Sequence, residues 1–198
     1  MSGAVWHEPA VARDARWERL GVRGGTVWLT GLSGSGKSTI GHALDTRLTS
    51  GGVPATVLDA DNLRHGLNVD LGFSDADRTE NVRRTAEVAR LFADAGTLAI
   101  VPIISPFADG RDAARAIHHR DGLDFWEVWV STPLDECERR DTKGLYAKAR
   151  AGDLRGLSGL DAPYEPPAHP DLVVGRGETV EEAVLALLNL IGPRGSMR

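Results

Sequence analysis

Short apolar runs alternate with segments of helical periodicity along most of this chain. The helical pattern is clearest from Ser74 to Gly96, where Ser74 and Asp77 form a capping box and small apolar residues recur on one face. We expect helices over residues 36–49, 74–96, 111–119, 134–140 and 180–191. We expect buried strands over residues 26–30, 55–58, 98–104, 125–130 and 172–174. This alternation predicts an α/β fold: a mostly parallel sheet with helices on both faces and ligands at the carboxyl ends of the strands.

Length and composition are those of one folded domain. The 198 residues are 41% hydrophobic and 26% charged, and no Pro/Gly/Ser-rich stretch separates two halves. We expect a single domain over residues 1–198 with an N-terminal extension over 1–24. The longest apolar run, 98–104, is too short to cross a membrane, and the N-terminus lacks the apolar region of a secretory signal. The single cysteine, Cys137, excludes an internal disulfide, so we expect a cytoplasmic protein.

The net charge of the chain and its small number of lysines limit the kinds of ligand that it is expected to bind. The net charge of −5 argues against a general nucleic-acid binder, which would normally be basic. Only three of the 23 cationic residues are lysines, which suggests that a lysine persists where an ammonium group is required. Two of the three, Lys143 and Lys148, lie in segment 138–155, which carries a local net charge of +3. The pair His118 and His119, at the end of a predicted helix, is expected on the surface.

Residues 31–38, G-L-S-G-S-G-K-S, match the phosphate-binding pattern G-x-x-x-x-G-K-[ST]. The motif stands between a predicted strand and a predicted helix, where backbone N–H groups and the helix N-terminus can hold phosphate oxygens; a plain Gly/Ser turn is the alternative. Lys37 would reach the β- and γ-phosphates, and the Ser38 hydroxyl would ligate Mg²⁺. The predicted ATP-binding residues of this motif are Gly31, Leu32, Ser33, Gly34, Ser35, Gly36, Lys37, Ser38 and Thr39.

The phosphate-binding loop alone does not separate a kinase from a GTPase or an ATP-driven motor. The chain is short, has no N-K-x-D motif for guanine, and has no aspartate at the end of the predicted strand 98–104. These features favour a compact phosphotransferase that acts on a small molecule.

An acidic cluster follows the second predicted strand. A carboxylate at this point can hold a Mg²⁺-bound water and accept the proton of an attacking hydroxyl. We expect Asp61 to play this role, with a turn or a helix cap as the alternative. Four arginines could contact anions, or could pair with acidic neighbours on a solvated helix: Arg64, Arg78, Arg83 and Arg84.

Several longer motifs resemble the signature of the adenylyl-sulfate (APS) kinases. They are D-A-D-N-L-R-H-G-L-N-V-D-L-G-F-S-D-A-D-R-T-E-N-V-R-R at 59–84, I-S-P at 104–106, C-E-R-R-D-T-K-G-L-Y-A-K-A-R at 137–150 and D-A-P-Y-E-P-P at 161–167. The resemblance implies a P-loop kinase fold and transfer of the γ-phosphate of ATP to the 3′-hydroxyl of adenosine 5′-phosphosulfate (APS), with Mg²⁺. The products would be ADP and PAPS, the activated sulfate donor. The resemblance also implies a homodimer, with ATP sulfurylase as a candidate partner.

The same resemblance implies roles for single residues. Asp61 becomes the catalytic base or the organiser of a metal-bound water, and residues 138–170 become a lid and substrate loop that excludes water. Ser105 becomes either a phosphoserine intermediate or a residue that hydrogen-bonds a phosphate, and Arg139 contacts ATP. The implied substrate-binding residues are Asp59, Asp61, Asn62, Arg64, Phe73, Arg78, Asn81, Ile104, Ser105, Lys143, Gly144, Leu145 and Leu157.

Two departures from the family pattern keep alternatives open. Leu157 stands where a phenylalanine normally stacks on the APS adenine, a contact worth about 1–3 kcal/mol, so we expect weaker APS binding or weaker substrate inhibition. Ala108 stands where the family often has arginine. One alternative is therefore a related kinase with another acceptor, and a second is a non-catalytic protein that binds APS or PAPS within a sulfurylase complex. Retention of the phosphoryl-transfer residues counts against the second alternative; they are Lys37, Ser38, Asp61 and Ser105.

Overall fold

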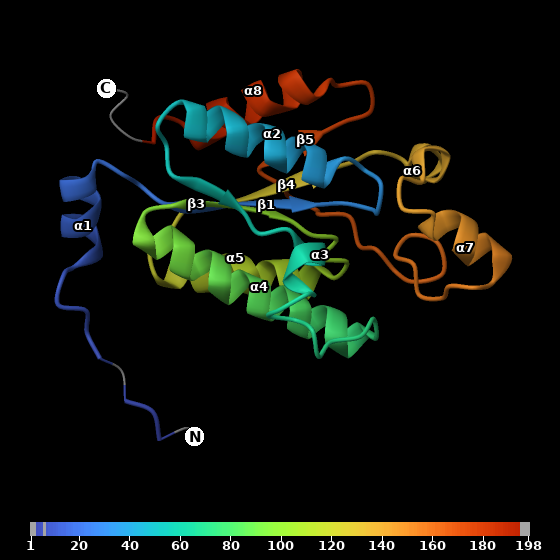
Figure 1. Ribbon diagram of the computed structural model, residues 1–198, viewed down its shortest axis with the longest axis horizontal. Helices are drawn as coiled ribbons and strands as arrows, with labels where there is room; N and C mark the ends of the chain where they lie inside the picture. The colour runs from blue at the N-terminus through green and yellow to red at the C-terminus, as the bar shows by residue number, and fades with distance from the viewer. Residues whose placement is uncertain (1–2, 6, 195–198) are drawn as a thin grey trace.

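A five-stranded parallel sheet runs through the computed structural model, which describes residues 3–5 and 7–194 (Figure 1). The strands are β1 (Gly25–Thr30), β2 (Ala55–Val57), β3 (Leu98–Pro102), β4 (Phe125–Val130) and β5 (Leu172–Val174), in the order β2-β3-β1-β4-β5. Val27 of β1 is paired with Ile100 on one side and Trp126 on the other, so β1 is the central strand. Every strand pairing is parallel, and each connection between successive strands contains a helix. The predicted α/β fold is therefore confirmed.

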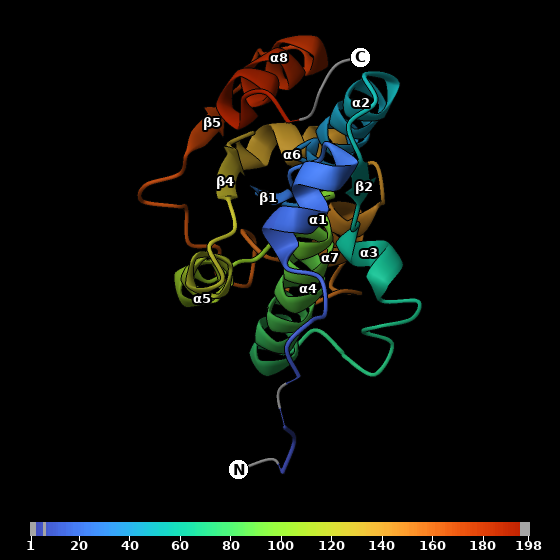
Figure 2. The ribbon, with the colours of Figure 1, turned by 90° about the vertical axis from the view of Figure 1, so that its left-hand side faces the viewer.

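Helices cover both faces of this sheet. Helices α2 (Lys37–Ser50) and α8 (Val180–Ile191) lie together on one face, and α4 (Asp75–Ala95) and α5 (Ala108–Arg120) cover the other (Figures 1 and 2). Each face has its own apolar core, with Leu29 and Leu44 in one and Trp28 and Ala89 in the other. Because β1 is buried along its whole length, its sequence is a continuous apolar-rich run rather than an alternating pattern.

Helix ends follow the predicted capping signals. The Ser74 hydroxyl accepts a hydrogen bond from the N–H of Asp77 at 3.2 Å, and Thr179 and Glu182 form a complete capping box at the start of α8. Gly96 ends α4 in the left-handed conformation. Among the described residues, none of the helices combines the length and apolarity that crossing a membrane requires.

Several elements differ from the sequence-based expectation. The remaining helices are α1 (Arg13–Leu20), α3 (Ala60–Leu63), α6 (Leu134–Arg140) and α7 (Leu145–Ala151), of which only α6 is predicted. Helix α7 forms in a polar stretch because the Asp141 carboxylate accepts hydrogen bonds from the N–H groups of Tyr146 and Ala147, at 3.1 and 2.9 Å. Helix α5 begins at Ala108, inside the predicted loop, where the carboxylate of the distant Glu165 accepts from the first N–H at 2.7 Å.

The expectation that His118 lies on the surface is wrong. Its imidazole is fully buried and packs against the Phe125 ring at a centroid distance of 5.0 Å. The ring nitrogens lie 2.7 Å from the carbonyl oxygen of Ala114 and 2.8 Å from the hydroxyl of Thr26. Burial lowers the pKa of His118 to about 4, so the ring is neutral near pH 7.

Candidate functional site

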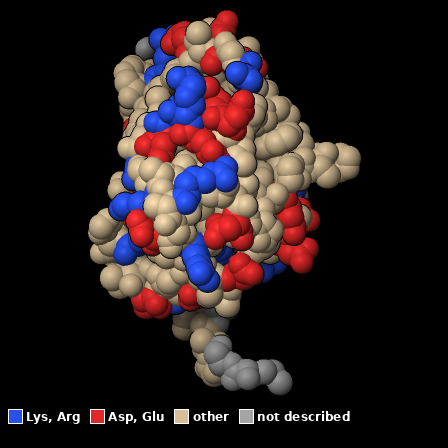
Figure 3. Space-filling view, turned by 90° about the vertical axis from the view of Figure 1, so that its right-hand side faces the viewer, with Lys and Arg blue, Asp and Glu red and all other residues tan. Residues whose placement is uncertain are grey.

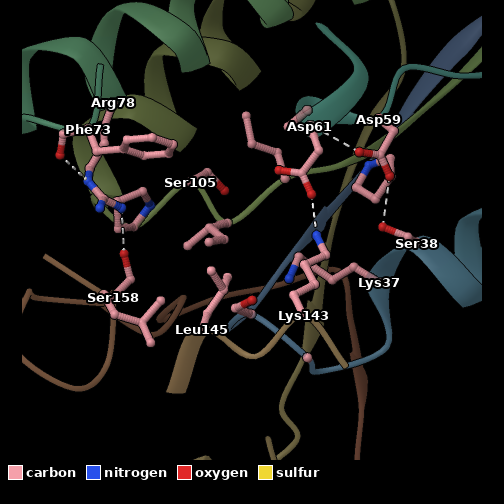
Figure 4. Close-up of a pocket in the computed structure, with 18 of the residues that line it drawn as sticks. Lys37, Ser38, Asp59, Asp61, Phe73, Arg78, Ser105, Lys143, Leu145 and Ser158 are labelled. Atoms are coloured by element: carbon pink, nitrogen blue, oxygen red, sulfur yellow. Dashed lines mark hydrogen bonds and ion pairs between the residues drawn. The ribbon is translucent and has the colours of Figure 1, made fainter. Parts of the chain in front are cut away.

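A cavity of about 520 Å³ opens beside the carboxyl ends of β1, β2 and β3, as expected for a parallel sheet. The segments that line it are far apart in the chain: residues 33–39, 59–64, 73–82, 102–106 and 140–158. Figure 4 shows Lys37 and Ser38 on one side of the cavity, Phe73 and Arg78 on the other, and Asp61 and Ser105 between them. One cavity therefore extends from the phosphate-binding loop to the side that carries Phe73 and Arg78.

The phosphate-binding loop has the conformation that its sequence predicts. Gly31 has φ +149°, and a side chain there would lie 2.5 Å from the carbonyl oxygen of Val130, so only glycine fits. Lys37 is 8% exposed, and its ammonium donates to the carbonyl oxygen of Leu32 at 2.6 Å. Burial lowers the pKa of Lys37 to about 8. Because burial disfavours the charged form of this lysine, an anion bound beside it would stabilise the ammonium group.

The two aspartates of the acidic cluster have different surroundings. Asp59 is the N-cap of α3, and its carboxylate accepts from the N–H of Asp61 at 2.9 Å and from the Ser38 hydroxyl at 2.8 Å. The Asp61 side chain is 63% exposed and forms an ion pair with Lys143 (Figure 4). The sequence predicted that Ser38 binds the metal directly and Asp61 through a water; in the structure the carboxylate in contact with the Ser38 hydroxyl is that of Asp59.

The Ser38 hydroxyl and the Asp59 carboxylate are oxygen donors of the kind that Mg²⁺ takes. Mg²⁺ usually keeps several waters and is held by one or two protein oxygens together with substrate phosphates. Among the residues that the structure describes, no group of three or more His, Cys, Asp or Glu side chains could hold a metal ion. The donor set at Ser38 thus fits a magnesium ion that is shared with a nucleotide.

On the opposite side of the cavity, two arginines are arranged around Phe73. The Arg64 guanidinium stacks over the Phe73 ring at 4.3 Å from its centre. Arg78 donates to the carbonyl oxygen of Phe73 at 2.9 Å and to the Ser158 hydroxyl at 2.8 Å, and so connects α4 to the 156–158 segment. Because the Phe73 ring is 65% exposed, it offers a flat apolar surface beside cationic groups.

Asn81, Ile104 and Ser105 form the floor of the cavity between these two sides. Asn81 accepts a hydrogen bond from the side-chain amide of buried Asn68 at 2.9 Å. Ser105 is buried, with 1% of its surface exposed. Its hydroxyl accepts a hydrogen bond from the Trp28 indole N–H at 3.1 Å and donates one to the Thr30 hydroxyl at 2.9 Å. The hydroxyl already has partners within the protein on both its donor and acceptor sides.

The predicted lid lies over the cavity next to the phosphate-binding loop. Lys143, Leu145 and Leu157 line the cavity, and Gly144 is the N-cap of α7. Sequence reasoning missed a role for Tyr146, which is buried and donates from its hydroxyl to the carbonyl oxygen of Ser33 at 2.9 Å. Burial raises the pKa of Tyr146, so its hydroxyl keeps the proton that it donates. The only signal in the sequence was an aromatic residue in an otherwise polar segment.

Some predicted site residues lie away from the cavity. Arg139 is 72% exposed and pairs with Glu136 at 2.6 Å, and the exposed Asn62 does not line the cavity. Arg83 and Arg84 both pair with Glu80, as the solvated-helix alternative predicted. On the face that carries α6 and α7, cationic and anionic side chains are interspersed, so the local positive charge is largely paired (Figure 3).

Comparison with known proteins gives a consistent result. The model of the family described as Adenylylsulphate kinase matches residues 23–175. The bifunctional enzyme CysN/CysC of Mycobacterium tuberculosis is 53% identical over 169 residues, which are 85% of this chain but 28% of that protein. The probable adenylyl-sulfate kinase of Halalkalibacterium halodurans is 51% identical over 181 residues, 91% of this chain and 89% of that protein. The solved structure of the Mycobacterium tuberculosis APS kinase CysC in complex with AMPPNP and APS superposes with a TM-score of 0.84 at 53% identity, covering 86% of this chain and 98% of that chain.

Proposed function

Because this chain belongs to the adenylylsulphate kinase family, we propose that it is an adenylyl-sulfate kinase that transfers the γ-phosphate of ATP to the 3′-hydroxyl of APS. The products are PAPS and ADP, and the reaction activates sulfate. The observation that carries the proposal is the shared cavity, in which a phosphate-binding loop faces an exposed carboxylate and an arginine–aromatic pair. A simple ATP-binding protein would not need the second half of that arrangement.

On the ATP side, the N–H groups of residues 31–38 and the start of α2 hold the phosphates, and Lys37 supplies a positive charge. Ser38 and Asp59 are the residues that would hold Mg²⁺, which would supply positive charge beside the phosphates of ATP. Arg140 lines the cavity at this end and is the arginine of α6 that we assign to the nucleotide, in place of Arg139. The assignment follows from exposure, because the Arg139 side chain faces solvent.

On the APS side, Arg64 and Arg78 supply cationic donors for the phosphosulfate, and Phe73 supplies a face for the adenine. The Asp61 carboxylate accepts the proton of the 3′-hydroxyl of APS while the oxygen of that hydroxyl bonds to the γ-phosphorus of ATP. In the same step, the bond between the γ-phosphorus and the bridging oxygen of ADP breaks. Lys143 forms an ion pair with Asp61, so a cationic side chain of the lid segment lies beside the carboxylate that takes the proton. Closure of the lid segment 138–170 over both nucleotides excludes water, which would otherwise accept the phosphate.

We assign Ser105 to binding and positioning, with direct in-line transfer between ATP and APS. A nucleophilic serine needs a free hydroxyl and a base, whereas this hydroxyl is buried and bonded to Trp28 and Thr30. We expect no phosphoserine at Ser105 during turnover, which mass spectrometry of the working enzyme tests. A phosphate on Ser105 that forms and disappears at the rate of turnover would contradict this assignment.

Domain organisation and assembly are part of the same proposal. We assign residues 1–198 to one domain, with residues 1–24 as an extension that contains α1. The chain spans 28% of the length of the bifunctional relative from Mycobacterium tuberculosis, so a region similar to this chain occurs within a longer, bifunctional protein. For this chain we propose a cytoplasmic homodimer and an association with ATP sulfurylase. Light scattering of the purified protein, with and without the sulfurylase, tests both.

One assay tests the proposed reaction. Purified protein is incubated with ATP, Mg²⁺ and APS, and PAPS and ADP are quantified together. We expect equal amounts of the two products, and a loss of about 10²–10⁴-fold in kcat for Asp61→Asn, the range for removal of a general base. Release of ADP only with a different hydroxyl acceptor would support a kinase of altered specificity. Binding of APS without any product would support the non-catalytic alternative and refute the proposal.

A further inference from the structure

Behind the floor of the cavity, the 104–108 loop is bound to a distant segment that returns from the lid. The N–H of Glu165 donates to the carbonyl oxygen of Pro106 at 2.8 Å. The Glu165 carboxylate accepts from the N–H of Ala108 at 2.7 Å, and the Tyr164 hydroxyl lies 3.1 Å from that of Thr30. The acceptor side of the cavity is therefore built on a contact between two segments that lie about 60 residues apart.

Arg111 lies at the centre of this contact. It extends from α5, is 2% exposed, and does not line the cavity. Its Nε donates to the Glu127 carboxylate at 2.7 Å, its Nη1 to the carbonyl oxygen of Ser105 at 2.7 Å, and its Nη2 to the carbonyl oxygen of Glu165 at 2.8 Å. A planar guanidinium can bind three fixed acceptors in this way, whereas the single ammonium of lysine cannot match the same fork.

The backbone of Ser105 requires such support. Ser105 has φ +41°, in the left-handed region that residues with a side chain adopt only when their surroundings hold them there. Arg111 holds its carbonyl group, while Trp28 and Thr30 hold its hydroxyl. This conformation sets the direction of Ile104 and Ser105, which line the floor of the cavity, the part that we assign to APS.

We propose that Arg111 is a positioning residue that sets the APS half of the site by holding Ser105 in its left-handed conformation and joining it to the segment that returns from the lid. The proposal rests on the assigned adenylyl-sulfate kinase activity. It differs from a general role in stability because the three hydrogen bonds of Arg111 end on Glu127, Ser105 and Glu165, none of which belongs to the phosphate-binding loop. Loss of these three hydrogen bonds should therefore change the kinetic parameters for APS and leave those for ATP nearly unchanged.

The experiment compares the steady-state kinetics of wild type, Arg111→Lys and Arg115→Lys. For Arg111→Lys we expect kcat/KM for APS to fall about 10- to 100-fold, as for small displacements of reacting groups, with the KM for ATP within about twofold. Arg115 is the matched control because it pairs with Asp171 at 2.7 Å and lies 3.5 Å from Glu127, in the same charged cluster, without contacting Ser105 or Glu165. We expect Arg115→Lys to lower the melting temperature without changing either substrate's KM.

A second comparison tests the backbone conformation itself. In the Arg111→Lys background, Ser105→Gly can adopt positive φ without support, whereas Ser105→Ala removes the hydroxyl but keeps the strain. We expect the glycine double variant to exceed the alanine double variant by about threefold or more in kcat/KM for APS. Equal values would refute the role of Arg111 in holding that backbone.

The outcomes separate the inference from the function on which it rests. A wild-type protein that makes no PAPS refutes the proposed function, whereas an active wild type with unchanged APS kinetics in Arg111→Lys refutes only the positioning role. Equal losses for ATP and APS, or for Arg115→Lys and Arg111→Lys, also refute it. If Arg111→Lys does not fold, Glu127→Gln, which keeps the arginine but removes its anionic partner, takes its place with the same criterion. A fall in kcat/KM for APS with the KM for ATP within about twofold supports the proposal, and unchanged APS kinetics refutes it.

Discussion

Raising the pH should remove the charge from Lys37 in the ligand-free protein and weaken ATP binding. The pKa of this ammonium is lowered from 10.5 to about 8, chiefly by desolvation and also by Lys143, while Cys137, Asp61 and Asp59 act in the opposite direction. The charged form is complete well below pH 8 and is lost above it. The phosphates of ATP bind the charged form, so affinity must fall as the pH rises through this range.

The magnitude follows from the fraction of lysine that is protonated. With a pKa of about 8, that fraction falls from about three-quarters at pH 7.5 to about one-tenth at pH 9, so the Kd for ATP should rise about eightfold. Burial raises the pKa of the neighbouring Cys137 thiol from its usual value of 9.0. Calorimetric titration with ATP at constant ionic strength, from pH 7.5 to pH 9 and without APS, measures the change and the accompanying proton uptake.

Lys37→Arg is the control for this experiment. A guanidinium stays charged throughout the interval, so the variant should bind ATP more weakly than wild type but with a Kd that does not change with pH. A wild-type Kd that stays constant to pH 9, without proton uptake on binding, would show that burial does not weaken the charge of Lys37. A similar slope in Lys37→Arg would assign the effect to another group.

Three further predictions concern residues around the cavity and the core. Because burial lowers the pKa of His118 to about 4, the neutral ring contributes fully to the free energy of unfolding above pH 6.5. This contribution falls by about 3 kcal/mol between pH 6.5 and pH 4, and urea unfolding of wild type and His118→Gln across that range measures the difference. Tyr146→Phe removes the hydrogen bond to the Ser33 carbonyl, and we expect about 1 kcal/mol less stability and a raised KM for ATP, from denaturant unfolding and kinetics. Leu157→Phe should tighten APS binding by about 1–3 kcal/mol through stacking, and should lower the melting temperature because Leu157 is already packed against Cys137 and Tyr146.

Each of the three has an outcome that contradicts it. Parallel pH profiles for wild type and His118→Gln would mean that the histidine takes up its proton equally in both states. A Tyr146→Phe variant with wild-type ATP kinetics would leave the hydroxyl without a role in positioning the phosphate-binding loop. Unchanged APS affinity in Leu157→Phe would show that the ring at this position does not reach the base.

Local physical rules explain most of the fold that was predicted from the sequence. The apolar run at 26–30 must be a buried strand, and G-L-S-G-S-G-K-S must turn tightly after it, because both follow from residues adjacent in the chain. The cap at Ser74 and the capping box at Thr179 likewise depend on residues three positions apart. The fold class, the phosphate-binding loop and the boundaries of α4 and α8 were accordingly predictable.

Tertiary structure decided the features that depend on distant partners. Asp59 and Asp61 stand two positions apart in the sequence, yet Asp59 accepts a hydrogen bond from the Ser38 hydroxyl whereas Asp61 forms an ion pair with Lys143. The burial of His118 depends on Thr26, which comes 92 positions earlier. In the sequence, Arg111 is one of several arginines on predicted helices, and only the structure shows its hydrogen bonds to Glu127 and to two backbone carbonyl groups. Nearby residues determine the elements of this protein, whereas charge, burial and hydrogen bonding in its site arise only when segments far apart in the chain come into contact.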